Sequence, residues 1–121
     1  ARAALEALAL QSMDVINTMA KDSGIDLKEL RVDGGASANN LLMQIQSDVT
    51  DLDIVRPEIV ETTAQGAAFL AGLAVGYWED MEEIKAIWKV DKKFSPSGSD
   101  VQKLKHNWAR AVERAKAWVE D

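Results

Sequence analysis

A short apolar run that meets two glycines and then passes into helical spacing constrains this sequence more than any other feature. The run occupies residues 30–32, Gly34 and Gly35 follow after one aspartate, and apolar residues recur at helical intervals from Leu41 onward. A buried strand end, a tight turn and a helix start must therefore fit within residues 30–40. We expect the helix to begin at about residue 36 and to end near residue 48.

The paired glycines allow two physical interpretations. Without a Cβ atom they permit positive φ and let another molecule approach the backbone closely. A helix start leaves N–H groups that attract anions, Ala36 is small, and Asn39 offers a donor and an acceptor. The functional interpretation is a nucleotide or phosphate cradle at Gly34, Gly35, Ala36 and Asn39. The alternative is a turn that needs glycine only for its dihedral angles, and spacing alone leaves both open.

A second strand is predicted at residues 53–56, where Pro57 stops it because proline cannot donate to a sheet ladder. With the strand at 30–32 and the helix between them, it makes a right-handed unit if both strands share one sheet. Two strands cannot form that sheet alone. Residues 88–94 alternate and are predicted as an edge strand or an extended segment. The fold class is therefore α/β, helix-rich with few strands.

Helical periodicity predicts further helices at residues 2–21, 79–87 and 101–119. Gly24 suits a left-handed cap after the first of them. The lysines and arginines of the last are expected to form a solvated face. In the short helix, Met81, Ile84 and either Ile87 or Trp88 are expected to face inward. The predicted apolar face of the first helix is Leu5, Leu8, Ser12, Val15, Ile16 and Met19.

Residues 62–78 carry no charge and are rich in alanine and glycine. Thr62 followed by Gln65 three positions later suggests a capping box at the start of a helix. A helix with small, uncharged residues all round is expected to be buried. Gly72 and Gly76 also fit a membrane helix, but the run falls short of the ~20 apolar residues that a bilayer needs. We therefore predict no membrane span.

Length and composition set limits on the function. The 121 residues suffice for one domain, and the net charge of -6 argues against a nucleic-acid partner. The sequence has no cysteine, which excludes disulfides and fits a reducing compartment, so we expect cytoplasmic localisation. It begins without methionine and already inside a predicted helix, so we expect a piece of a larger protein.

Catalytic side chains are scarce. His106 is the only histidine and lies between a lysine and an asparagine, which favours a surface role. Asp33 could hold a metal-bound water, although a structural role that accepts N–H groups of the turn is favoured. We assign no catalytic residue and no metal ligand. The tryptophans at positions 78, 88, 108 and 118 are interpreted as core and interface anchors.

Several separate motifs, in the same order, resemble the C-terminal part of the glycerol kinases in the FGGY carbohydrate kinase family. The resemblance extends from the first helix to Pro96 and weakens after Ser97. The motifs are Leu30-Arg31-Val32-Asp33-Gly34-Gly35-Ala36-Ser37-Ala38-Asn39-Asn40, Met43-Gln44, Gln46-Ser47-Asp48, Arg56-Pro57-Glu58, Glu61-Thr62-Thr63-Ala64-Gln65-Gly66-Ala67-Ala68 and Leu70-Ala71-Gly72-Leu73-Ala74-Val75-Gly76-Tyr77-Trp78.

The resemblance implies part of an actin-like, ribonuclease H-like ATPase domain. Residues 1–121 would be the C-terminal portion of its nucleotide-side domain, with residues 96–121 as the terminal loop and helix. Gly35 would lie against the nucleotide near the α-phosphate and ribose, with Gly34 and Ala36 shaping the approach. Asn39 would contact the adenosine part. The cofactors implied are ATP or ADP and Mg²⁺.

The implied reaction is transfer of the γ-phosphoryl group of ATP to glycerol. Family residues that bind phosphate and glycerol, and the catalytic aspartate, would precede Ala1, so we expect this piece alone to be inactive. The parent is expected to be a homo-oligomer. Two alternatives remain: another FGGY sugar kinase, such as a pentulose kinase, and a non-catalytic helical interaction module.

Overall fold

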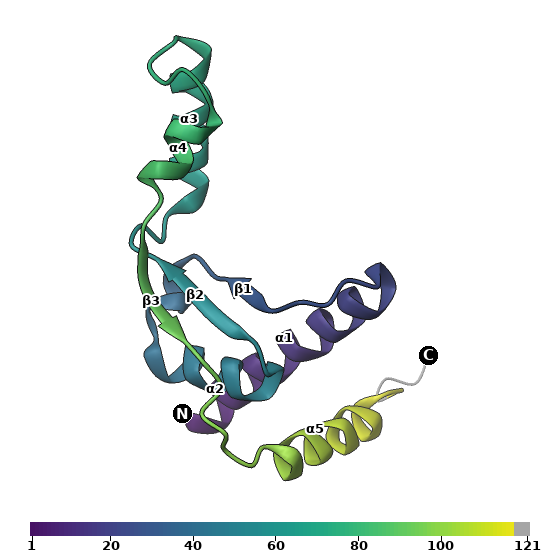
Figure 1. Ribbon diagram of the computed structural model, residues 1–121. Helices are drawn as coiled ribbons and strands as arrows, with labels where there is room; N and C mark the ends of the chain where they lie inside the picture. The colour runs from purple at the N-terminus through teal and green to yellow at the C-terminus, as the bar shows by residue number, and fades with distance from the viewer. Residues whose placement is uncertain (118–121) are drawn as a thin grey trace.

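The structure is a computed structural model that describes residues 1–117. A compact part, here called the body, comprises residues 1–57 and 90–117, and an arm of residues 58–89 projects from it (Figure 1). The elements in chain order are α1 (Arg2–Ser23), β1 (Glu29–Arg31), the 3₁₀ helix η1 (Gly35–Ala38), α2 (Asn40–Thr50), β2 (Asp53–Pro57), α3 (Thr62–Ala74), α4 (Met81–Ile87), β3 (Val90–Phe94) and α5 (Gln102–Ala115).

The three strands form one mixed sheet in the order β1-β2-β3. β1 and β2 are parallel, with Leu30 opposite Ile54, and α2 connects them as predicted. β3 adds antiparallel to β2 and places Phe94 opposite Ile54, so residues 90–94 are an edge strand. The register of this pair shifts between Arg56 and Pro57. The α/β, helix-rich prediction is confirmed.

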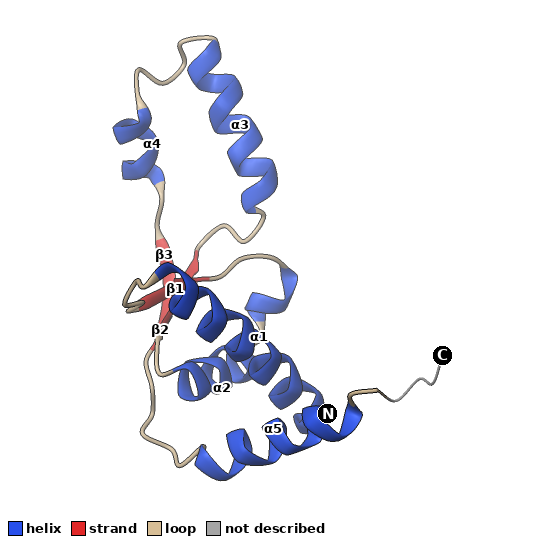
Figure 2. Cartoon of the chain, turned by 90° about the vertical axis from the view of Figure 1, so that its right-hand side faces the viewer, coloured by secondary structure: helices blue, strands red, loops and turns tan. Residues whose placement is uncertain are grey.

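One hydrophobic core lies between the sheet and the helices α1 and α2. In Figure 2, α1 passes in front of the strands and α2 lies below them. Ile54 is 0% exposed and lies at its centre. Ser47 is also fully buried, and its hydroxyl donates to the Leu52 carbonyl at 2.7 Å. α5 packs at the edge of this core, where the Trp108 indole N–H donates to an Asp14 carboxylate oxygen at 2.7 Å. The charged face of α5 is solvated, as predicted.

The buried face of α1 differs from the predicted one. Leu8, Val15 and Met19 are each at least half exposed, whereas Ala9, Leu10 and Met13 are buried. Apolar residues occupy more than one stripe of this helix, so periodicity alone could not select the stripe that meets α2. The small Ala9 one turn before Met13 lets the two helices approach closely. Gly24 ends α1 in the left-handed conformation, with φ 66°, as expected.

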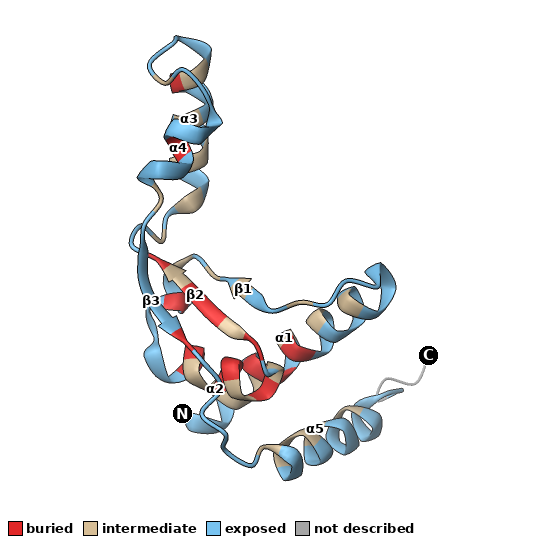
Figure 3. Ribbon diagram, in the orientation of Figure 1, coloured by how far each residue is buried: buried red, intermediate tan, exposed pale blue. Residues whose placement is uncertain are grey.

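The prediction that residues 62–78 form a buried helix is wrong for this chain. α3 ends at Ala74, and Gly72 is its only buried residue. Leu70 is 70% exposed, and Val75, just beyond the helix, is 81% exposed. Figure 3 shows α3 almost entirely in the colours of exposed and intermediate residues. The reason is the position of α3: it extends away from the sheet beside α4, so no strand or long helix of the described residues covers it. Trp78 packs on Gly72 and lies edge-on to Phe69, with ring centroids 5.2 Å apart.

Two further local predictions need correction. Thr62 is the first residue of α3 rather than its cap, and Glu61 occupies the capping position without a side-chain hydrogen bond, so no capping box forms. In α4 only Ile84 is buried, and Met81 is more than half exposed. Trp118 lies outside the described residues. Within residues 1–117, no helix combines the length and apolar character that crossing a bilayer requires.

Candidate functional site at the carboxyl end of the parallel strands

The glycine turn lies where the parallel strands β1 and β2 end. In open α/β sheets this edge is where ligands bind. The Val32 N–H donates to the Val55 carbonyl at 3.1 Å and extends the ladder one residue beyond β1. The Gly34 N–H then donates to the Val60 carbonyl at 2.9 Å. The turn is therefore held against the segment that leaves β2.

The two glycines differ in why they are glycines. Gly34 has φ 75° and ψ 170°, a conformation open to glycine almost alone. Gly35 has no positive φ, and a Cβ added there would meet nothing within 4 Å. Neither backbone geometry nor packing within the described residues therefore requires glycine at position 35. The open space leaves room for a molecule from outside the chain to approach the backbone closely.

The predicted helix start is wrong in one respect. Residues 35–38 form the 3₁₀ helix η1, and α2 begins only at Asn40. Asn39 breaks the two apart, because its Oδ1 accepts the Leu42 N–H at 3.1 Å and caps α2. The Ser37 hydroxyl donates to the Gly34 carbonyl at 2.7 Å and closes η1 on the glycine turn.

The four predicted site residues lie within one short segment, from the turn to the cap of α2. Gly35, Ala36 and Asn39 are exposed, and Gly34 is half-buried. Asp33 behaves differently from the expectation. Its carboxylate accepts a hydrogen bond from the Thr62 hydroxyl of α3, rather than the N–H groups of the turn. Asp33 thus ties the glycine turn to the first residue of the arm.

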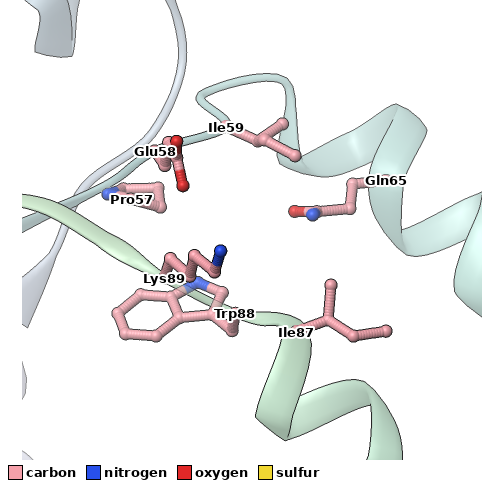
Figure 4. Close-up of a pocket in the computed structure, with 7 residues that line it drawn as sticks. All are labelled: Pro57, Glu58, Ile59, Gln65, Ile87, Trp88 and Lys89. Carbon is pink, nitrogen blue, oxygen red and sulfur yellow. The ribbon is translucent and has the colours of Figure 1, made fainter.

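Two pockets lie beside the turn without including its four residues. One, of about 270 Å³, is lined by Arg31, Val32, Asp33, Pro57, Thr62 and Trp88. Its volume is below the roughly 300 to 1,000 Å³ of small-molecule sites. The other lies at the base of the arm, with Gln65 pointing into it from α3 (Figure 4). It is lined by Pro57, Glu58, Ile59, Gln65, Ile87, Trp88 and Lys89.

Sequence reasoning missed Arg56 as a member of the site. Its guanidinium contacts the carbonyl of Ser37 and the side chain of Asn40. A signal was present in the spacing: Arg56 lies two residues after the buried Ile54 on β2, so both side chains face the covered side of the sheet. A charged residue there needs partners. His106 is exposed on α5, and within the described part of the chain no three acidic or histidine residues gather as a metal site would require.

Comparison with known proteins gives one family. The model of the C-terminal domain of the FGGY family of carbohydrate kinases matches residues 1–75. The protein named glycerol kinase from Burkholderia vietnamiensis is 58% identical over all of this chain, and that from Nitratidesulfovibrio vulgaris (strain Miyazaki F) is 56% identical. The chain spans about a quarter of the length of these relatives.

Solved structures agree on the fold. A crystal structure of Plasmodium falciparum glycerol kinase with ADP matches 98% of this chain and 24% of its own, with a TM-score of 0.81 and 34% identity. A gluconate kinase from Lactobacillus acidophilus also has a TM-score of 0.81, covering 97% of this chain and 24% of its own at 22% identity. The body and arm are therefore arranged as in part of an actin-like ATPase domain.

Proposed function

Because this chain belongs to the FGGY family of carbohydrate kinases, we propose that it is a piece of a glycerol kinase and supplies the adenosine side of the nucleotide cleft. The whole enzyme would transfer the γ-phosphoryl group of ATP to a terminal hydroxyl of glycerol. The relatives named glycerol kinase at 56% to 58% identity support glycerol as the phosphoryl acceptor. The Plasmodium falciparum glycerol kinase, whose crystal structure is of the enzyme with ADP, supports the choice of nucleotide.

The open space in front of Gly35 carries the proposal. Its φ is not positive and no atom of the described chain lies within 4 Å of a built Cβ, so a ligand is the best reason for glycine at this position. Gly35 would lie against the nucleotide near the α-phosphate and ribose. Gly34 would turn the backbone away, and Ala36 would keep the approach unobstructed. Asn39 would contact the adenosine part through its amide NH₂, since its Oδ1 caps α2.

Mg²⁺ and the phosphoryl acceptor would be held elsewhere in the parent protein. Among residues 1–117 no three acidic or histidine side chains gather into a metal site, and we assign no Mg²⁺ ligand to the described chain. Asp33 is engaged with Thr62 and is not assigned as a base. We therefore propose that the 121-residue chain alone has no kinase activity, and that the parent is a cytoplasmic homo-oligomer.

Residues 1–121 would all belong to the nucleotide-side domain, with residues 96–121 as its terminal loop and helix. Contacts of α5 support this assignment. Trp108 and Leu104 pack at the core that α1, α2 and the sheet share. The Ser97 N–H also donates to an Asp48 carboxylate oxygen at 2.7 Å and ties the loop to α2.

The proposal is tested by titrating ADP into the full-length kinase and its Gly35→Asp variant. A carboxylate at this position would crowd and repel the phosphates, so we expect the dissociation constant for ADP to rise on the order of a hundredfold. Ala109→Asp, which adds the same charge to an exposed position on α5, is the matched control and should leave it unchanged. An unchanged constant for Gly35→Asp would refute the proposal that Gly34, Gly35, Ala36 and Asn39 form the nucleotide-binding surface, here called the nucleotide seat.

The sugar is tested separately with a panel of polyols and pentuloses. The full-length enzyme should phosphorylate glycerol with the highest kcat/KM. A pentulose as the best substrate would replace glycerol kinase with the other FGGY alternative and leave the nucleotide seat intact. Clear formation of glycerol 3-phosphate by the 121-residue chain alone would contradict the assignment of the remaining parts.

A further inference from the structure

Arg56 joins the sheet to the segment that carries the candidate nucleotide seat. One guanidinium nitrogen donates to the Ser37 carbonyl at 2.8 Å and to the Asn40 Oδ1 at 2.9 Å. Ser37 belongs to η1 and Asn40 is the first residue of α2. A single side chain from β2 therefore contacts both helical pieces on either side of Asn39.

The other edge of the same guanidinium is fixed by β3. Arg56 Nε donates to Asp91 Oδ2 at 2.8 Å, and the second terminal nitrogen lies 2.7 Å from the same oxygen. The Arg56 side chain is only 11% exposed. Its Cζ also lies 5.5 Å from the centroid of the Phe94 ring. The guanidinium group is therefore nearly enclosed, and its hydrogen bonds on two sides leave the side chain little rotational freedom.

The chain of contacts ends at the glycines. Arg56 holds the Ser37 carbonyl, the Ser37 hydroxyl donates to the Gly34 carbonyl at 2.7 Å, and Gly34 directly precedes Gly35. Ser37 is 2% exposed, so this path runs beneath the seat rather than across its surface. The face of Gly35 and Ala36 that would meet the nucleotide stays open.

We propose that Arg56 is a positioning residue that sets the height and tilt of the η1 segment against the nucleotide, with Asp91 fixing the guanidinium in turn. This inference rests on the proposed function, because it concerns the same seat. Arg56 does not touch the nucleotide. Its loss should displace the backbone at Gly34 and Gly35, and small displacements of a binding backbone are costly.

The test uses the full-length kinase with Arg56→Lys and Arg56→Ala. One ammonium group cannot reach Ser37, Asn40 and Asp91 together, so Arg56→Lys should share the defect. We expect both variants to raise the KM for ATP and the dissociation constant for ADP about tenfold, while the KM for glycerol and kcat at saturating ATP change less than about twofold. Asp91→Asn should give a smaller rise in the same two nucleotide constants.

Chemical rescue separates positioning from general stability. Guanidinium ion, at a concentration that does not denature the protein, should restore ADP affinity in Arg56→Ala and leave Arg56→Lys unchanged, because the lysine fills the space. Arg2→Lys is the matched control: Arg2 pairs with Glu6 at 2.7 Å but is 73% exposed, and its variant should bind ADP like the parent. If Arg56→Ala does not fold, Arg56→Lys and Asp91→Asn carry the test.

Four outcomes would overturn the inference. A lowered Tm with both KM values unchanged would mean that Arg56 is structural only. Equal rises in the KM for ATP and glycerol would mean that it acts on the whole cleft. If Gly35→Asp in the same titration weakens ADP binding and the Arg56 variants do not, this inference fails while the proposed function stands. If Gly35→Asp has no effect, both fail together.

Discussion

The body has a core of buried aliphatic side chains, whereas the arm leaves most of its own in solvent. In the body, Ile54 and Val49 lie between the sheet and two helices. In the arm, Leu70 and Val75 face outward although residues 62–78 carry no charge. The residues around Ile54 and Val49 and those of α3 are both rich in apolar side chains, so apolar character alone does not explain the difference in burial. Burial depends on whether a second layer lies within reach, and only the body has one.

The comparison also bears on the proposed parent. An exposed apolar surface of this kind favours association with another surface. The relatives are about four times as long as this chain, and a parent of that length would have ample polypeptide to cover the arm. The body already has a hydrophobic core, and the side chains of Ser47 and Arg56 each have hydrogen-bond partners within it. We therefore expect the body to behave as a folded unit and the arm to depend on its neighbours.

The largest contrast should come from truncating one aliphatic side chain in each region. Ile54→Ala removes a fully buried side chain and should lower the free energy of unfolding of the 121-residue chain by about 2 to 5 kcal/mol. Leu70→Ala in the arm should change it by about 0.5 kcal/mol or less, because Leu70 is already in solvent. Urea denaturation followed by circular dichroism measures both. Equal losses would show that the arm is packed as tightly as the body.

Amide hydrogen exchange should divide the chain along the same line. We expect the amides of α2 and β2 to exchange on the order of a hundredfold more slowly than those of α3, which corresponds to about 3 kcal/mol in opening free energy. Mass spectrometry of peptic peptides measures this. In the full-length kinase the difference should shrink, because the proposed remainder covers the arm. Slow amide exchange in α3 of the 121-residue chain would show that the arm is as stable as the body.

A smaller effect is expected from the buried hydroxyl of the body. Ser47→Ala leaves the Leu52 carbonyl without its 2.7 Å donor and should cost about 1 to 2 kcal/mol. Ser99→Ala, on the exposed loop before α5, is the matched control and should be close to neutral. Thermal unfolding of both variants checks this. A neutral Ser47→Ala would indicate that water replaces the hydroxyl and that the body is less closed than its burial implies.

The smallest effect is a pH dependence confined to the body. The Lys93 ammonium, and then the Ser95 hydroxyl, hydrogen-bond the Asp53 carboxylate and lower the pKa of Asp53 from its ordinary 3.8. The same bond with Asp53 raises the pKa of Lys93 above 10.5. Asp53 therefore stabilises the fold above pH 3.8 and loses this contribution as pH falls through its lowered pKa. Lys93 stabilises it below pH 10.5 and loses this contribution as pH rises through its raised pKa.

Asp53→Asn should therefore flatten the fall of stability on the acid side and the fall on the alkaline side. Urea midpoints across pH measure it, and both changes should be small because these groups face solvent. Asp26→Asn, an exposed aspartate before β1, is the control and should keep the parent profile. An unchanged pH profile in Asp53→Asn would show that the Asp53–Lys93 pair does not contribute to the stability of the body.

Much of the fold can be predicted from residues that act on their immediate neighbours. Pro57 marked the end of β2, Gly24 the end of α1, and alternation marked the edge strand β3. The glycine turn was expected between a strand and a helix, and it lies there. The break at Asn39 was missed because its side chain competes for the Leu42 N–H, a choice that periodicity does not register. Arg56 was missed because its partners come from residues 16 to 35 positions away.

The sequence by itself determined roughly where most of the helices and strands lie, that a helix connects the first two strands, and where the backbone near positions 34 and 35 lacks side chains. Those properties depend on neighbours within a few residues. Only the tertiary structure decided which stripe of α1 is buried, that α3 lies in solvent, and that Gly34 needs its geometry while Gly35 does not. Burial and open space depend on which distant surfaces meet, and no short stretch of sequence encodes that.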